Sequence, residues 1–252
     1  MLKKILMLVP LFVISSACTL VIPVQFMPTV TLTTPSATVT ETSTPLPTET
    51  PTPTPTDTPV PTPTVLLPGD ILFSDNFTNP ESGWDRVRDE IKISDYENGG
   101  YRMWLNQKQY DMWANPGRQF TTPVRIEVDA IKSGGPDNNG FGLICDYQDV
   151  GNFYYGEISS DGYAIIGKVQ GGKSSYLSAD KMQPVKGINS GDATNHIRLD
   201  CINGSLTLYA NDQQVAQVND STFSSGDVGL QVSTFTDVGV DMLFTNFVVK
   251  FP

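Results

Sequence analysis

Aromatic side chains are the residues of this sequence best suited to binding a ligand. Trp104, Tyr110 and Trp113 lie close together, and a second aromatic-rich stretch runs from 147 to 163. Tryptophan and tyrosine combine a large apolar face with a polar edge, so their rings can stack on the C–H faces of sugars. Folded cores need such rings as well, and packing in a core or at an edge is the alternative for each ring. We nominate Trp104, Trp113 and Tyr155 as ligand-binding residues.

Paired carboxylates would be needed for a glycosidase, because that chemistry places two acidic groups on either side of the scissile bond. Glu127 and Asp129 project from one face of a predicted strand, but Ile131 and Lys132 stand where a second catalytic glutamate would be required. We therefore interpret Glu127 and Asp129 as polar residues of a solvated sheet face. Glu157 is interpreted as a surface residue without a role. These patterns favour a binding protein over an enzyme and provide no catalytic residue.

Nucleophilic and metal chemistry find little support in the sequence. His196, the one histidine, opens a predicted strand, and no G-x-S-x-G motif accompanies it. We interpret it as a polar residue at a strand end. A zinc site is excluded by the small number of histidines and cysteines. The glycine-rich turn 134–140 offers oxygen ligands, so Asp137 and Asn139 are weak calcium candidates, with an ordinary loop as the favoured alternative. We expect no other cofactor.

The three cysteines predict one anchor and one bridge. Cys145 and Cys201 both fall on the apolar phase of predicted strands, and an exported domain meets an oxidising environment in which such thiols usually pair. We therefore predict a Cys145–Cys201 disulfide, with two separate buried thiols as the alternative. Cys18 is then left as a candidate for lipidation.

Residues 1–17 have the pattern of a signal peptide. Two lysines precede the apolar run 5–14, which is too short to span a membrane, and small residues follow it. Three outcomes at Cys18 stay open. Cleavage before a lipidated Cys18 gives a lipoprotein, although Ser15 stands where a lipobox usually has an aliphatic residue. Cleavage after Ala17 gives a secreted protein, and no cleavage gives an uncut anchor.

A Pro/Thr-rich tract occupies residues 27–68 and includes TETPTPTPTDTPVPTPT. Proline fixes φ and lacks a backbone N–H, and few apolar side chains are present to offset the entropy of ordering. We predict a disordered linker of polyproline II type that holds the following domain away from a surface. Its threonines are candidates for O-glycosylation, with an unmodified linker as the alternative. A spacer suits an anchored protein, so we expect residues 18–26 to be a lipid-anchored segment on the outer face of the cell membrane.

The remaining residues, 69–252, consist of short segments that alternate between apolar and polar side chains. The segment VRIEVDAI places aliphatic residues on one side and charged residues on the other, which is typical of a half-buried strand. A later segment puts Phe141, Leu143, Cys145 and Tyr147 on one side, which we assign to the core. The many short strands predict an all-β fold, an antiparallel two-sheet jelly-roll sandwich.

Two tight hairpins are predicted toward the end of the chain. Asn203-Gly204 and Asn211-Asp212 each separate two runs of alternating hydrophobicity, and both turn positions need the left-handed backbone that Asn, Asp and Gly tolerate. Other predicted strands are ILFSDNF, GGYRMWL, NFYYGEI, YAIIGKV, GDVGLQVSTF and VDMLFTNFVVKF.

Four marks resemble the concanavalin A-like/laminin G-like jelly-roll superfamily. They are an opening D-x-F segment at 75–77 with Gly83-Trp84, a tyrosine-rich pair of central strands, the Asn-Gly hairpin, and a closing F-x-N-F segment at 244–247. The resemblance covers nearly all of residues 71–249. More narrowly, this segment is similar to sandwich domains on lipoproteins of filamentous green non-sulfur bacteria. It is more distantly similar to the 3-keto-disaccharide hydrolase-like family. It implies two sheets, one of them concave, and in many members carbohydrate binding on that face or on the loops above it.

The sequence therefore predicts a cell-surface module that binds carbohydrate or cell-wall polymer. One alternative is a hydrolase acting on small sugar derivatives, and another is a structural or sensing domain with a protein partner. The net charge is −11, from 27 acidic and 16 basic residues, and the predicted domain has no basic block, so a nucleic-acid partner is not expected. We expect an extracytoplasmic location, with the membrane contacted through the N-terminal lipid.

Overall fold

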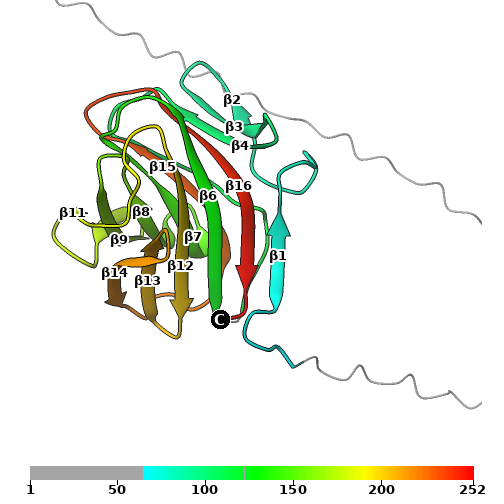
Figure 1. The fold of residues 1–252 in the computed structure, drawn as a ribbon. Helices are drawn as coiled ribbons and strands as arrows, with labels where there is room; N and C mark the ends of the chain where they lie inside the picture. Colours follow the sequence, from blue (N-terminus) through cyan, green and yellow to red (C-terminus); the bar gives the residue numbers. More distant parts are fainter. Residues whose placement is uncertain (1–64, 122) are drawn as a thin grey trace, which may run out of the picture. The chain divides into compact units, whose positions relative to one another are not determined.

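The structure of the protein is a computed structural model that describes residues 65–121 and 123–252. Within these ranges the chain is all-β, and two antiparallel sheets pack against each other (Figure 1). None of the described residues forms a helix that could cross a membrane. The predicted signal peptide, Cys18 and the linker up to residue 64 lie outside the described residues, so the predictions made for them remain predictions.

The larger sheet has nine strands. Their order is β14-β13-β12-β6-β16-β4-β3-β2, and β1 pairs with β16 on the edge that β4 also uses. Its strands are β1 (Ile71–Asp75), β2 (Val87–Arg88), β3 (Lys92–Glu97), β4 (Gly100–Leu105), β6 (Val124–Gly134), β12 (Thr194–Ile202), β13 (Ser205–Ala210), β14 (Gln213–Asn219) and β16 (Val240–Lys250).

The smaller sheet has seven strands in the order β10-β9-β8-β7-β15-β5, and β11 also pairs with β9. Its strands are β5 (Tyr110–Ala114), β7 (Asn139–Asp149), β8 (Asn152–Ile158), β9 (Tyr163–Gln170), β10 (Lys173–Tyr176), β11 (Gln183–Pro184) and β15 (Asp227–Thr234). The all-β, two-sheet prediction is therefore confirmed.

Alternating side chains build the core between the sheets. In β6, Val124, Ile126 and Val128 are fully buried, whereas the charged residues between them are partly exposed. Phe141 and Leu143 of β7 enter the same core from the smaller sheet. One face of each sheet is thus removed from water, and each fully buried side chain of this size contributes about 1.5–3 kcal/mol to stability.

The opening and closing sequence marks meet in one aromatic cluster. Trp84 packs edge-on against Phe77 and Phe247, with ring centroids 5.2 and 4.9 Å apart. Its indole N–H donates to Asp75 Oδ2 at 3.0 Å, which satisfies the one polar group that a buried tryptophan carries. Asp75 Oδ1 accepts a bond of 2.7 Å from the Phe77 amide. These contacts tie the region after β1 to β16.

Both predicted hairpins are confirmed. Asn203 and Gly204 have φ values of 49° and 81°, and Asn211 and Asp212 have φ values of 48° and 65°. The strands on either side of each turn pair with each other, β12 with β13 and β13 with β14. All four turn residues therefore adopt the left-handed backbone conformation that Asn, Asp and Gly tolerate.

A bulge in β7 changes the direction of one predicted core residue. Asp146 has a φ of 50°, and in the pairing of β7 with β15 two residues of β7 between Ile144 and Tyr147 oppose one residue of β15. Beyond the bulge, Tyr147 packs with the outer apolar cluster, its ring 5.5 Å from that of Phe153. The prediction that Tyr147 faces the core was wrong, because the extra residue breaks the period of two.

The predicted disulfide between Cys145 and Cys201 is confirmed. Cys145 lies in β7 and Cys201 in β12, so the bond joins the two sheets through the core. The two residues are 56 positions apart in the sequence, and a cross-link over such a loop mainly restricts the unfolded chain.

Removing this cross-link should destabilise the fold without changing it. For a Cys145→Ala/Cys201→Ala double variant we expect the free energy of unfolding to fall by about 4 kcal/mol, as loop-closure entropy predicts. Urea unfolding followed by tryptophan fluorescence measures the change, and wild-type protein in reductant is the matched control. An unchanged unfolding midpoint in both would contradict a stabilising role for the bond.

Candidate functional site

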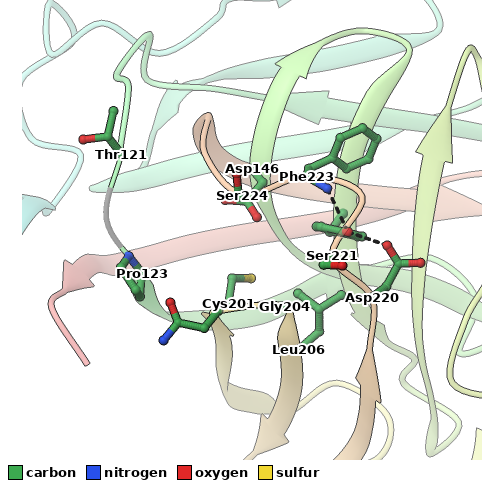
Figure 2. Close-up of a pocket in the computed structure, with 12 residues that line it drawn as sticks. Thr121, Pro123, Asp146, Cys201, Gly204, Leu206, Asp220, Ser221, Phe223 and Ser224 are labelled. Atoms are coloured by element: carbon green, nitrogen blue, oxygen red, sulfur yellow. Dashed lines mark hydrogen bonds between the residues drawn. The ribbon is translucent and has the colours of Figure 1, made fainter.

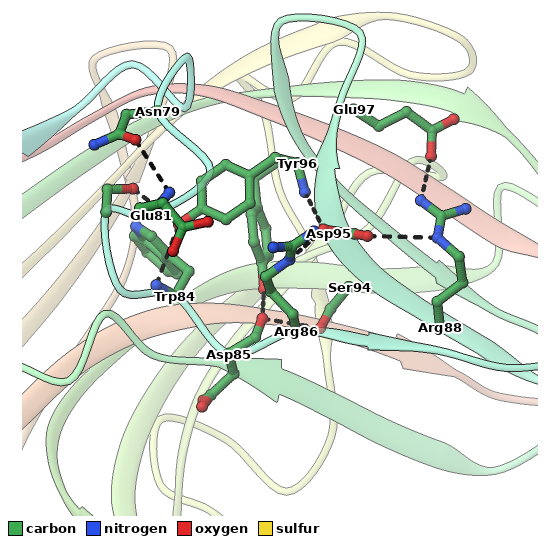
Figure 3. Close-up of polar contacts among 12 residues, drawn as sticks. Asn79, Glu81, Trp84, Asp85, Arg86, Arg88, Ser94, Asp95, Tyr96 and Glu97 are labelled. Atoms are coloured by element: carbon green, nitrogen blue, oxygen red, sulfur yellow. Dashed lines mark hydrogen bonds and ion pairs between the residues drawn. The ribbon is translucent and has the colours of Figure 1, made fainter.

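The outer face of the larger sheet is covered by ion pairs. Arg102 of β4 makes two bonds of 2.8 Å to the carboxylate of Asp241 in β16. Near the β2 edge, Arg86 and Arg88 both approach Asp95, at 2.7 and 3.4 Å (Figure 3). Because these donors and acceptors satisfy one another, this face leaves few polar groups free for a ligand.

The carboxylates that the sequence assigned to a solvated face lie on this side of the larger sheet. Glu127 accepts a bond of 2.6 Å from Lys250 Nζ. Asp129 Oδ1 lies 2.8 Å from Nδ1 of His196, and the other Asp129 oxygen accepts from Asn246. These contacts fit the interpretation of all three residues as polar groups of a sheet surface.

The outer face of the smaller sheet, called the groove face below, carries a row of five residues from five strands. Trp113 of β5 lies opposite Gln231 of β15, Gln231 lies opposite Gly142 of β7, and Gly142 lies opposite Glu157 of β8. Glu157 in turn lies opposite Ile165 of β9. Directly opposed residues in an antiparallel sheet point to the same side, so this register brings the row together.

A pocket of about 360 Å³ opens on this row. Two glycines of β7 allow β8 and the Glu157 carboxyl to pack closely against β7. A Cβ at Gly140 would overlap Oε1 of Glu157, and a Cβ at Gly142 would overlap the backbone oxygen of Gly156. The residues that line the pocket are Asp111, Tyr155, Glu157, Ser174, Ser175, Tyr176, Gln231 and Phe235.

Two tyrosines line this pocket in different ways. The Tyr155 hydroxyl is 3.0 Å from Ser174 Oγ, and its ring lies over Gly167, which has no side chain to displace it. Tyr155 is 4% exposed, whereas Tyr176 is 43% exposed. The ring of Tyr155 is thus buried in the wall of the pocket, whereas the exposed ring of Tyr176 can contact a ligand.

An apolar cluster underlies the groove face. It consists of Ile144, Phe153, Tyr155 and Ile165, and the half-buried ring of Trp113 packs against it with its centroid 5.2 Å from that of Phe153. Two further openings share lining residues with this pocket. One, around Trp113, shares the wall residue Asp111, and the other, around Tyr163 and Met182, shares Phe235. The hollowed surface therefore extends beyond a single pocket.

Glu157 is the most perturbed group of the groove face. It is 3% exposed, and its Oε1 has no hydrogen-bond partner among the described residues. Burial raises the pKa of Glu157 to about 8; Ser233 and Gln231 lower it in part, and the charge of Asp111 raises it further. The carboxyl is therefore mostly protonated at neutral pH. The prediction that Glu157 is a surface residue was wrong, because this outer face is packed and not solvated.

The nominated aromatic residues divide between the two sheets. Trp113 and Tyr155 both lie on the groove face. Trp104 of β4 is paired with Ile93 and Asp241 on the outer face of the larger sheet, so it cannot contact the same ligand as Trp113. Alternation identifies residues that point outward but does not say from which sheet. Gln231 and Ser233 were missed, although the polar phase of GDVGLQVSTF marks both.

The two calcium candidates use their polar atoms within the protein. Asp137 Oδ1 accepts a bond from Lys132 Nζ. Asn139 Oδ1 accepts from the Ser160 amide at 2.9 Å, and its Nδ2 donates to Pro136 O and to Ser160 Oγ. Residues 65–121 and 123–252 contain no group of three or more His, Cys, Asp or Glu side chains placed to share a metal ion. Calcium binding at this turn remains a prediction.

A second cavity, of about 340 Å³, lies near the disulfide (Figure 2). Two of its polar groups already have partners: the Tyr154 hydroxyl donates to Asp220 Oδ1 at 2.5 Å and accepts from the Phe223 amide at 3.0 Å. Asp220 also accepts from Lys168 Nζ at 2.8 Å. These bonds give the cavity a structural explanation, which the unpartnered oxygen of Glu157 lacks.

Comparison with solved structures places the fold among jelly-roll sandwiches. The carbohydrate binding module CBM66 from Bacillus subtilis superposes with a TM-score of 0.52 at 19% identity, covering 67% of this chain and 96% of that one. A protein of unknown function with a galectin-like fold, also from Bacillus subtilis, gives a TM-score of 0.54 at 11% identity over 74% of this chain and 98% of its own. A GH43 protein from Bacillus licheniformis gives 0.52 at 12% identity, with 71% of this chain matching 39% of that enzyme.

The TM-scores show a common fold, at low sequence identity. No protein-family profile matches the chain, and no curated protein sequence matches it. The chain is thus an all-β, two-sheet jelly-roll sandwich, with a groove face on its smaller sheet.

Protonation of Glu157 should make stability depend on pH. Its pKa is 4.5 in its ordinary state and about 8 in the folded protein, so folding favours the protonated form. The stabilisation is complete below pH 4.5 and is lost as pH rises through 8, a change of about 5 kcal/mol at 1.36 kcal/mol per pKa unit. Urea unfolding of wild type and Glu157→Gln at pH 5, 7 and 9 measures it. In the variant the free energy of unfolding should not fall with pH in this way. The same dependence on pH in the two proteins would contradict the buried state of Glu157.

Proposed function

We propose that this protein is a carbohydrate-binding module whose ligand lies on the groove face. The observation that carries the proposal is Glu157, a buried carboxyl whose Oε1 has no partner among the described residues, in a pocket walled by Tyr155 and Tyr176. An unsatisfied buried polar atom costs about 1–3 kcal/mol, and a ligand hydroxyl would supply the missing partner. The structural similarity to the carbohydrate binding module CBM66 supports the proposal.

The groove face offers both apolar and polar groups to a sugar. The rings of Trp113 and Tyr176 and the apolar cluster beneath them suit the C–H faces of a pyranose or furanose ring. Gln231, Ser233 and Asp111 stand on the same face and suit hydroxyl groups. Apolar surface with a few placed polar groups is the usual composition of a small-molecule site.

We also propose that the module is carried outside the cell as a lipoprotein, with Cys18 as the lipidated residue and the Pro/Thr-rich tract as a spacer. The charged and apolar pattern of residues 1–17 and the composition of residues 27–68 support this location. The ligand would then be a glycan or a cell-wall polymer that the protein meets at the cell surface.

A hydrolase acting on sugar derivatives is the second candidate, as the distant resemblance to the 3-keto-disaccharide hydrolase-like family implies. One observation favours it: a protonated Glu157 and the carboxylate of Asp111 line the same pocket. Glycoside hydrolysis uses one protonated and one ionised carboxyl group. Release of reducing sugar or keto-sugar by the wild-type chain, abolished in Glu157→Gln, would favour this activity over binding alone.

The two outward-facing tryptophans provide a matched test of the binding site. In native gels that contain levan, xylan, laminarin or cell-wall glycan, we expect the full-length chain to be retarded by at least one polymer. Trp113→Ala should weaken this binding about tenfold or more, because it removes a large aromatic contact from the groove face. Trp104→Ala, on the other sheet, should bind as the wild type does. Equal loss in both variants would contradict the assignment of the groove face, and no retardation by any polymer would favour a sensing or structural role.

The anchor has its own test. In a bacterial host given labelled palmitate, the wild-type chain should incorporate label and sediment with membranes. Cys18→Ser should lose both properties, because the thiol that takes the lipid is absent. Unchanged labelling of the variant would contradict lipidation at Cys18.

A further inference from the structure

The surroundings of Glu157 restrict what its carboxyl can do. Gly140 and Gly142 leave room beside it on β7, and Ile165 is its neighbour on β9. Among the described residues that line its pocket there is no cation, and the other ionisable groups are Asp111, Tyr155 and Tyr176. A carboxylate at this place would be desolvated and would face the negative charge of Asp111 without a counter-ion among the lining residues.

We propose, resting on the carbohydrate-binding function above, that Glu157 holds its ligand as a neutral carboxylic acid, which donates a hydrogen bond to a hydroxyl or ring oxygen of an uncharged sugar. The proton stays on Glu157 throughout, and no covalent bond changes. The residue thereby selects for acceptor oxygens and makes binding depend on pH.

Charge in the pocket defines the class of sugar. An ammonium group has no acceptor lone pair, so an amino sugar that places this group at Glu157 cannot accept the hydrogen bond of the neutral carboxyl. A uronic acid would bring a second negative charge toward Asp111, which lines the same pocket. A neutral hexose or pentose unit meets neither obstacle, and its hydroxyls can also reach Gln231 on the neighbouring strand.

The other ionisable groups of the pocket do not obscure a pH titration below 9.5. Burial raises the pKa of Tyr155, and it raises that of Tyr176 as well, so both phenols remain protonated over this range. Asp111 acts on Glu157 through its charge, which raises the pKa of Glu157. Removal of that charge should therefore move the titration of Glu157 to lower pH.

The test measures the affinity of the full-length chain from pH 6 to 9.5 for the neutral polysaccharide retained in the gel screen. Wild-type affinity should fall about 30-fold by pH 9.5, because only the protonated fraction is competent and the pKa of Glu157 is about 8. Glu157→Gln, which keeps a neutral donor, should bind at pH 6 and show no such loss. Asp111→Asn should shift the midpoint to lower pH. Glu127→Gln, on the other sheet, is the matched control and should follow the wild type.

The outcomes separate this inference from the proposed function. Affinity that is independent of pH in the wild type, loss of binding by Glu157→Gln at pH 6, or preference for chitosan oligosaccharide over neutral polymers would overturn the inference alone. Absence of binding to every polymer would overturn the proposed function as well. The chemical shift of the Glu157 carboxyl carbon, followed by NMR against pH, measures the protonation of this residue in the wild type. A titration midpoint near 4.5 would also overturn the inference.

Discussion

Trp113, Gln231 and Glu157 share one face because three successive strand pairs hold their register. A slip of one residue in any of these pairs would turn its side chains to the other side of the sheet. The register is secured from the opposite side, where Phe141 and Leu143 of β7 are buried in the core between the sheets. Packing of the core therefore positions the residues of the groove face. Successive residues of each strand point alternately to the core and to the groove face, so one register fixes both faces.

The two sheets treat their outer faces differently. The larger sheet pairs many of its outward charges with one another, as in the two hydrogen bonds between Arg102 and Asp241. The smaller sheet packs an apolar cluster outward and leaves the Glu157 carboxyl buried with one oxygen unpartnered among the described residues. Such an arrangement costs stability, which the core and the Cys145–Cys201 bond supply elsewhere. A local cost that the fold tolerates is most simply understood as a requirement of function.

Much of the fold could be predicted from the sequence, because strands, tight turns and a buried cysteine pair each leave a local pattern. The Asn203-Gly204 turn and the disulfide are examples. The candidate site could be predicted only in part, because alternation shows that a residue points outward but not from which sheet. Trp104 and Trp113 both occupy outward positions of a strand, yet only Trp113 lies on the groove face. The burial of Glu157 depends on residues from several strands and on the β10–β11 segment, and no local pattern reveals it.

The central claim is that the groove face, and not the cavity near the disulfide, binds the glycan. An amide NMR titration of the full-length chain with a bound polysaccharide fragment tests it most directly, since both surfaces are read in one experiment. The account predicts shifts at Gly140, Gly142, Gln231 and Ser233, with Asn203 and Gly204 unaffected. Shifts confined to the residues around Asn203 and Asp220 would contradict it.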